Sequence, residues 1–417
     1  MDILQAVLPG VAAALFLWGA AVCVRRLFWP DPEGPAPSPA CKGEYVRVLA
    51  ACLCAGLCFI TLFSVCALWQ YPGQGLAAAV QRFFGQNIDS NSYVGLAQYG
   101  YGTGSSELWP EQTVQIVFFP LFPALLRVVS LGGRLPLHLA GFLLQIPLFC
   151  WAGTALYALL RRNYGPGAAR WALAFLLVAP GAFFFFTPMT ESLFLALSVS
   201  FFLALEKDRP AAAGWLGLLA ALCRSPGALL AGAAAAWYIL CWRREKSAPR
   251  PAALWPVAAP ALGLGMYLLL NWRVYGNWFQ FAVYQKEHWH QGPGFFTDTV
   301  RYHLGYFASW WAGGNRAGAL FISLAAVCTI LCSLALLTLT AKKLAVHHLA
   351  YGLAYLAFTM GATWLLSAPR YAEGLFLLPA ALALTARRRG TRWLVLAVLT
   401  VLGAVYTVEF IRHGPIY

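Results

Sequence analysis

Long apolar runs separated by short polar segments occupy almost the whole chain. A helix needs about 20 apolar residues to cross the ~30 Å hydrocarbon core of a bilayer. Runs near that length predict an all-α polytopic membrane protein, a bundle of about twelve transmembrane helices. The predicted spans are Ile3–Phe28, Val46–Trp69, Leu137–Leu160, Ala168–Phe186, Ser192–Leu205, Ala211–Cys223, Gly227–Trp242, Ala252–Asn271, Ala317–Thr340, Leu344–Leu366, Tyr371–Thr385 and Trp393–Ile411. Several are shorter than a full crossing, so we expect tilted, broken or re-entrant helices among them.

One further apolar run, Ile116–Leu131, is not expected to cross. Its prolines, Pro120 and Pro123, each remove a backbone donor and disfavour helix in the preceding residue. A full crossing there would also place every later basic cluster on the opposite side of the membrane. We therefore predict a juxtamembrane or re-entrant segment that leads into Leu137–Leu160.

Composition and charge agree with a membrane protein. Hydrophobic residues make up 60% of the 417 positions and charged residues 11%, against roughly 25% charged in soluble domains. The formal charge of +14 arises from short Lys and Arg clusters beside apolar runs, which is the pattern of cytoplasmic loops. We therefore expect no nucleic-acid partner, both termini outside, and a multi-pass protein of a bacterial plasma membrane.

The polar segments suggest how the chain is organised. Residues 1–45 form an additional N-terminal transmembrane helix and a cytoplasmic linker, because the positive charges follow the apolar run as in an anchor. Residues 46–417 form the main transmembrane domain. Its two outer loops, 70–136 and 272–316, hold most of the polar surface that is not cytoplasmic, so chemistry is expected there.

Asp89 is the candidate catalytic residue of the first outer loop. It follows a complete apolar span by about twenty residues, and a carboxylate at that boundary can accept a proton from a sugar hydroxyl. The plainer interpretation is a solvated loop acid or a helix N-cap, since Asp89-Ser90-Asn91 is a good capping sequence.

Three charged residues stand at the ends of apolar spans on the same predicted side. Arg224 and Arg370 lie outside the basic clusters, and a guanidinium forms bidentate bonds to phosphate. Interfacial snorkelling explains both equally simply. Glu191 begins an apolar helix, where it is either a helix-terminal acid, a partner of Arg224, or a ligand of sugar hydroxyls.

The second outer loop carries a run of polar and aromatic residues. Lys286, His288, Trp289 and His290 are candidates for phosphate and sugar recognition, although interfacial aromatic residues look the same in a sequence. The two histidines do not have the HExxH spacing, and the cysteines lack a paired zinc spacing with histidines. We expect no metal and no cofactor.

Several short motifs occur in an order that resembles one known family. They are Asp89 with Tyr99-Gly100-Tyr101, Phe118-Phe119-Pro120-Leu121-Phe122-Pro123, Thr190-Glu191-Ser192-Leu193-Phe194, Cys223-Arg224-Ser225-Pro226-Gly227 and Ser367-Ala368-Pro369-Arg370-Tyr371. The set resembles the PIG-V type GPI mannosyltransferase II family and its bacterial relatives, although Ile88 stands where that family has tryptophan. The family belongs to the GT-C superfamily, whose members take a sugar from a polyprenyl phosphate on the non-cytoplasmic side.

The resemblance implies an inverting, mannosyltransferase-like GT-C enzyme. Asp89 would deprotonate an acceptor hydroxyl, while the polyprenyl-phosphate leaving group is held by Arg224, Arg370 and Lys286. Sugar or acceptor contacts are expected from Glu191, Tyr93, Tyr101, His288, Trp289, His290 and Tyr371. The acceptor, a glycolipid, glycan or protein, is left open. A polytopic transporter or lipid flippase without transferase chemistry is the alternative, and a scaffold without chemistry is a third hypothesis.

Overall fold

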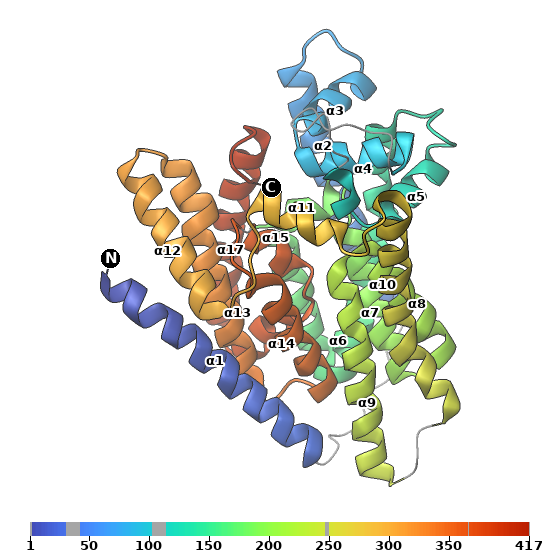
Figure 1. Cartoon of the computed structure of the whole chain (residues 1–417), viewed down its shortest axis with the longest axis vertical. Helices are drawn as coiled ribbons and strands as arrows, with labels where there is room; N and C mark the ends of the chain where they lie inside the picture. The colour runs from blue at the N-terminus through green and yellow to red at the C-terminus, as the bar shows by residue number, and fades with distance from the viewer. Residues whose placement is uncertain (1, 31–41, 102–113, 247–249, 366, 417) are drawn as a thin grey trace.

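The computed structural model describes residues 2–30, 42–101, 114–246, 250–365 and 367–416, and within them every regular element is a helix (Figure 1). The prediction of an all-α polytopic membrane protein is confirmed. The helices are α1 (Asp2–Phe28), α2 (Lys42–Gln70), α3 (Leu76–Gly85), α4 (Ile88–Tyr99), α5 (Leu121–Val129), α6 (Leu137–Val178), α7 (Glu191–Glu206), α8 (Pro210–Cys223), α9 (Leu230–Glu245), α10 (Leu254–Tyr275), α11 (Gln280–Trp289), α12 (Phe296–Ala312), α13 (Ala325–Thr340), α14 (Val346–Met360), α15 (Ala368–Glu373), α16 (Leu377–Thr385) and α17 (Arg389–Ile411). Short helical turns are η1 (Val114–Val117), η2 (Ala182–Phe186), η3 (Ser225–Leu229), η4 (Pro251–Ala253) and η5 (Gly318–Leu324).

Seven helices of the described chain are long and apolar enough to cross a membrane. They are α1, α2, α6, η3 with α9, η4 with α10, η5 with α13, and α17. Other predicted spans are shorter helices, namely α7, α8, α14 and α16. The 42-residue α6 contains two predicted spans, which are separated at Gly165, where φ is +84°. Glycine tolerates that left-handed conformation without a side-chain clash.

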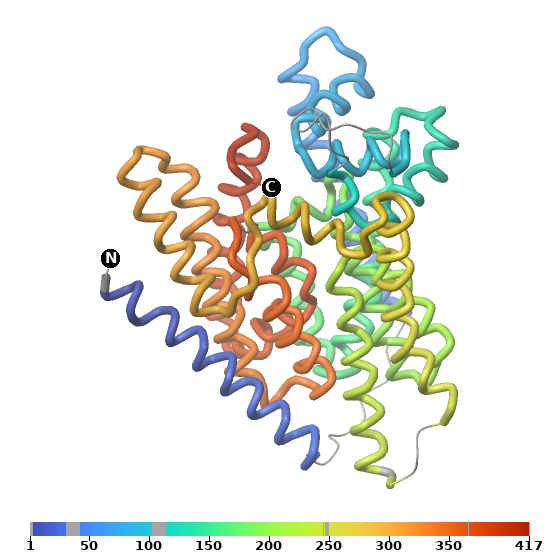
Figure 2. Tube along the Cα trace, viewed as in Figure 1, coloured from blue at the N-terminus to red at the C-terminus, as the bar shows by residue number. Residues whose placement is uncertain are grey.

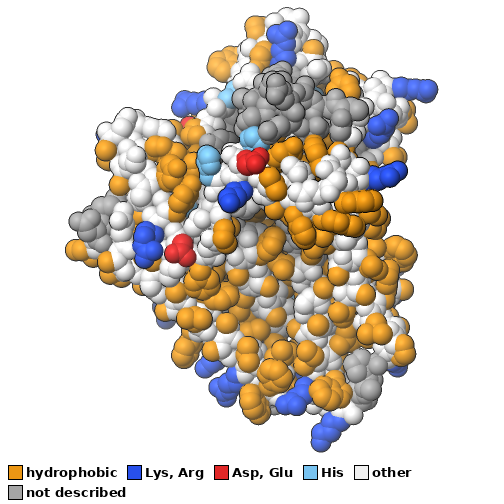
Figure 3. Space-filling view, in the orientation of Figure 1, with side chains coloured by type: hydrophobic (Ala, Val, Ile, Leu, Met, Phe, Trp, Pro, Cys, Tyr) orange, Lys and Arg blue, Asp and Glu red, His pale blue; other side chains and the backbone are white. Residues whose placement is uncertain are grey.

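Helices differ in what they face. In α7 nearly every side chain is buried, whereas only Phe410 is buried in α17. Figure 3 shows hydrophobic side chains spread over the middle and lower surface. A large continuous apolar surface of this kind is expected where a protein contacts lipid rather than water.

One group of basic residues lies at the end of the bundle where α1 and α9 end. Arg26 donates to the carbonyls of Ala341 and Leu344, and Arg243 donates to the carbonyl of Phe28. Figure 3 shows Lys and Arg side chains along the lower edge, and others on the upper half of the same face. Because α1 packs on α12, α13 and α14, it belongs to the same bundle. The linker of the predicted 1–45 unit lies largely outside the described residues, and that domain division stays a prediction.

Short helices cap the opposite end. Figure 2 shows α3, α4 and α5 at the top of the molecule, far from the lower end of α9. Helix α5 has nine residues and therefore rises about 14 Å, less than half of a bilayer's hydrocarbon thickness. The 116–131 segment does not cross as one helix, as the sequence predicts.

Candidate active site

A cavity of about 820 Å³ lies beneath the cap, at the end of the bundle opposite the lower ends of α1 and α9 (Figure 1). Its walls come from distant parts of the chain: the start of α4, the segment before α5, the end of α8, α11, the segment leading into α15, and residues 410–416. The cavity combines aromatic rings with convergent polar side chains. Such a cavity is where a ligand site is expected in a protein of unknown function.

Four charged side chains form an acid–arginine cluster at this cavity. Arg370 contacts both acids. Its Nη1 contacts Asp89 Oδ2, and its Nε lies 2.5 Å from Glu191 Oε1. Arg224 Nη1 lies 2.8 Å from the same Glu191 oxygen. Two carboxylates and two guanidiniums thus balance one another in a site that is mostly withdrawn from water.

Asp89 is the cluster member most open to the cavity. Its side chain is 26% exposed, against 7% for Arg370 and 0% for Glu191. It lies in the first turn of α4, where the helix dipole favours a negative charge. The N-cap is Asn87, whose side chain accepts from the Ser90 amide at 3.0 Å. Asp89 is therefore not the cap, and its carboxylate is available for other contacts.

Glu191 lies behind the arginines and does not border the cavity. Its contact with sugar stays a prediction, whereas its pairing with Arg224 is confirmed. A carboxylate at the buried start of α7 needs such partners, because an unpaired buried charge is strongly destabilising. Glu191 thus holds the two guanidiniums beside the cavity.

The two arginines differ in how they are held. Arg370 uses Nε and Nη1 on the two acids. Arg224 has one ion pair within the described chain, to Glu191, and its guanidinium lies 5.1 Å from the centre of the Tyr371 ring. Both side chains border the cavity. Arg370 orients Asp89, whereas Arg224 retains more hydrogen-bonding capacity toward an anion.

The other predicted residues divide into two groups. Tyr93, Tyr371, His288, Trp289 and His290 border the cavity. Burial raises the pKa of Tyr93 well above its ordinary value, with Arg224 acting in the opposite direction. Tyr93 is therefore a neutral phenol.

Lys286 and Tyr101 do not border the cavity. Lys286 is exposed on α11, between the cavity residues Gln285 and His288. The Tyr101 hydroxyl donates to the backbone carbonyl of Phe118 at 2.6 Å and so braces the chain before α5. The phosphate-binding role expected for Lys286 and the sugar-contact role expected for Tyr101 therefore gain no support from the cavity and stay predictions.

Sequence reasoning missed several polar residues of the cavity wall. Gln86, Asn87, Gln285 and Asn315 place amide groups there, and the chain after α17 contributes His413. Gln70 fixes that last segment by donating to the carbonyl of Ile411 at 2.7 Å and lying 3.1 Å from His413 Nε2. Amides in outer loops are common in any sequence, so only the folded chain singles these out.

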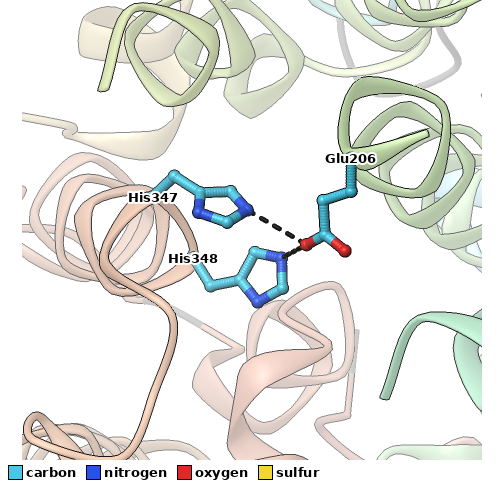
Figure 4. Close-up of side chains that lie close together, drawn as sticks. All are labelled: Glu206, His347 and His348. Atoms are coloured by element: carbon cyan, nitrogen blue, oxygen red, sulfur yellow. Dashed lines mark hydrogen bonds and ion pairs between the residues drawn. The ribbon is translucent and has the colours of Figure 1, made fainter. Parts of the chain in front are cut away.

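Glu206, His347 and His348 form a second buried cluster (Figure 4). Glu206 Oε1 is 3.1 Å from His347 Nε2 and 2.9 Å from His348 Nε2. The three ligand atoms lie within 4.8 Å of one another, a donor set that suits zinc. The Tyr164 hydroxyl lies 2.9 Å from His348 Nδ1 and fixes that ring.

Charge argues against a metal at this second cluster. Arg162 Nε lies 3.3 Å from Glu206 Oε2, and Asn163 also donates to this carboxylate. Arg162 already neutralises the glutamate, so a divalent cation would leave a net positive charge in a buried site. The residues fit a hydrogen-bonded link between α6, α7 and α14 better than a metal centre. The expectation of no metal stays a prediction.

Neither a family model nor a curated protein matches this sequence. Three solved structures from Archaeoglobus fulgidus are similar to this chain. The archaeal oligosaccharyltransferase AglB in complex with an inhibitory peptide and a dolichol-phosphate shares 13% identity over 88% of this chain and 55% of that chain, with a TM-score of 0.43. The oligosaccharyltransferase in complex with Zn and sulfate shares 13% identity over 88% of this chain and 51% of that chain (TM-score 0.41), and the oligosaccharyltransferase tethered to an acceptor peptide containing the NVT sequon shares 12% identity over 89% of this chain and 55% of that chain (TM-score 0.43). The chain spans about half the length of these proteins. A likeness at this level identifies no activity, and membership of a mannosyltransferase family stays a prediction.

Proposed function

We propose that the protein is a membrane glycosyltransferase that moves a sugar, with inversion, from a polyprenyl-phosphate donor to an acceptor hydroxyl on the non-cytoplasmic face. The observation that carries this proposal is the position of Asp89. Its carboxylate borders an 820 Å³ cavity, is held by Arg370, and lies at the end of the bundle opposite the lower ends of α1 and α9.

Asp89 has the geometry of a general base. Arg370 engages Oδ2, whereas Oδ1 has no hydrogen-bond partner among the described residues. A fixed carboxylate with one oxygen open to a cavity can accept the proton of an acceptor hydroxyl as that oxygen attacks the anomeric carbon. The bond to the phosphate oxygen then breaks, and the donor leaves as polyprenyl phosphate.

Arg224 is the residue best placed to stabilise that leaving group. Negative charge develops on the phosphate as the sugar departs, and a pre-positioned guanidinium lowers the barrier most when water is excluded. Arg224 is 9% exposed, borders the cavity and is held by Glu191. We assign it this role alone, because Lys286 is not among the cavity-lining residues and Arg370 already holds both acids.

The sugar and the acceptor are proposed on different grounds. The ordered motifs resemble mannosyltransferases, which suggests mannose, while His288, Trp289 and Tyr371 supply the aromatic and polar surface that a sugar needs. The acceptor must carry a hydroxyl that reaches Asp89. A glycolipid, a glycan or a protein hydroxyl meets that requirement.

The decisive experiment replaces Asp89 by Asn, which keeps the shape and removes the base. Purified protein in nanodiscs is assayed for transfer from radiolabelled polyprenyl-phosphate mannose to membrane-lipid and glycan acceptors. We expect the transfer rate of D89N to be about 10²–10⁴-fold lower than that of the wild type. The matched control is Asp208→Asn, since Asp208 is 77% exposed and pairs only loosely, at 3.6 Å, with Arg250.

Full transfer activity in D89N would remove the mechanism. Uptake of a solute or lipid by proteoliposomes, without any sugar transfer, would favour the transporter alternative.

The proposed orientation has its own test in intact cells. In a variant whose native cysteines are replaced by serine, single cysteines replace Lys286 on α11 and Asp208 between α7 and α8, both exposed. An impermeant thiol reagent is then added outside. Labelling of K286C but not D208C is expected. The reverse pattern would place the cavity on the cytoplasmic side.

A further inference from the structure

A second hollow, an open groove of about 640 Å³, runs along α12. It is bordered by Asp298, Arg301, Tyr302, Tyr306 and Ser309 on that helix and by Thr363 across from it. None of these residues takes part in the acid–arginine cluster, so the groove is separate from the reaction centre.

The sequence of α12 gives the helix two distinct faces. Phe296, Val300 and Leu304 are buried, with spacings of four that place them on one side. Asp298, Arg301, Gly305 and Ser309 recur at spacings of three and four on the other side and are exposed. Charged side chains on a lipid-facing surface are costly. This face of α12 is therefore expected to meet water, unlike the apolar exposed face of α17.

Hydrogen bonds hold the wall that faces α12. The Thr299 hydroxyl donates to the carbonyl of Gly361 at 2.7 Å. Gly292 and Thr363 exchange two backbone hydrogen bonds, at 3.0 and 3.1 Å. The groove is thus a fixed feature of the fold.

Chain segments that border the groove continue directly to residues that border the catalytic cavity. Thr363 borders the groove, and the next two residues, Trp364 and Leu365, border the cavity. Gly292, which pairs with Thr363, lies two residues after His290, and His290 borders the cavity. A chain-like molecule whose end reaches the cavity could therefore continue along α12.

The chemistry of the groove suits a sugar chain. The Tyr302 and Tyr306 rings lie 4.8 Å apart, and Gly305 between them leaves open space. Asp298 and Arg301 are 3.7 Å apart and about half exposed, so both remain able to bond hydroxyls. Their charges cancel, which disfavours an anionic headgroup. Pockets with aromatic walls and a few polar groups fix the orientation of neutral polar ligands.

We infer that this groove binds the sugar units of an oligosaccharide acceptor that precede the unit receiving the new sugar. The inference rests on the proposed function. It makes the acceptor a glycan of several units rather than a single sugar.

A tryptophan at position 305 blocks the groove without touching the cluster. A Cβ at Gly305 meets nothing within 4 Å, so G305W should fold. The matched control is Gly390→Trp, another exposed helical glycine with open space, at the basic end. Binding of maltotetraose, cellotetraose and an α-linked mannotetraose to nanodisc-embedded full-length protein is measured by saturation-transfer NMR, for the wild type, both variants and D89N.

We expect at least one tetrasaccharide to bind the wild type, G390W and D89N alike, and to bind G305W at least tenfold more weakly. No binding of any probe to the wild type, or equal binding to G305W, would overturn the groove proposal. Displacement of the sugar by inorganic phosphate would also overturn it, because the site would then bind anions. If tetrasaccharide binding behaves as expected while no transfer is found, the proposed function fails, and the groove remains a sugar-binding site but not an acceptor site.

Discussion

Helix α7 begins and ends with a buried glutamate, and the two ends of this one helix have different surroundings. Glu191 is neutralised by Arg224 and Arg370 beside a cavity, whereas Glu206 is neutralised by Arg162 and bonded by two histidines in a closed interior. Both satisfy the requirement that a buried charge be paired. Burial and pairing alone therefore do not mark an active site. What distinguishes the Glu191 end is that its arginines reach a cavity that also exposes Asp89.

The largest expected effect comes from removing each glutamate's charge. E191Q leaves two guanidiniums with only Asp89 as partner, and breaking a buried pair in this way costs about 3–5 kcal/mol. We expect E191Q to lower the midpoint of thermal unfolding and also to reduce the transfer rate of the folded fraction more than 100-fold. E206Q should lower the midpoint while leaving the rate of the folded fraction within about twofold. Scanning fluorimetry and the transfer assay on the same samples measure both.

Equal loss of specific activity in E206Q would contradict this division between a catalytic and a structural end. A normal rate in E191Q would show that the arginines need no support from Glu191.

A smaller effect is expected at the residue proposed to stabilise the leaving group. R224K keeps a positive charge but loses the planar donor set that binds phosphate, so we expect kcat to fall about 10²-fold, within the range for removing one charge-stabilising donor. K286A is the comparison, since Lys286 is exposed and lies outside the cavity, and its kcat should change less than twofold. A large loss in K286A with little loss in R224K would exchange their roles.

The smallest effect is expected from metal removal at the Glu206 end. Because Arg162 already balances Glu206, EDTA should leave the unfolding midpoint unchanged, and added zinc should raise it by less than about 1 °C. H348A is the control, because it removes one of the two histidine contacts to Glu206. If the cluster holds helices together, H348A should lower the unfolding midpoint both with EDTA and with added zinc. A midpoint that drops with EDTA and recovers with zinc would make this cluster a metal site.

The sequence determined the class of the protein and the segments that carry the acid–arginine cluster. Runs of about 20 apolar residues can only be stable across a bilayer or in a large apolar core, and the Lys and Arg clusters between them mark one side. The sequence also predicted the loop that carries Asp89 and the non-crossing segment 116–131. Proline and helix-capping residues change the backbone only a few positions away, so a local pattern is enough to predict their effect.

Only the tertiary structure decided which charges meet. Arg370 is separated by 179 residues from Glu191 and by 281 from Asp89, and Glu206 is 141 residues from His347. No local pattern encodes such contacts, because they depend on how helices pack. Neighbours on α11 show the same limit: Gln285 and His288 border the cavity and Lys286 does not. Successive residues of a helix point about 100° apart, and packing alone sets which direction faces inward.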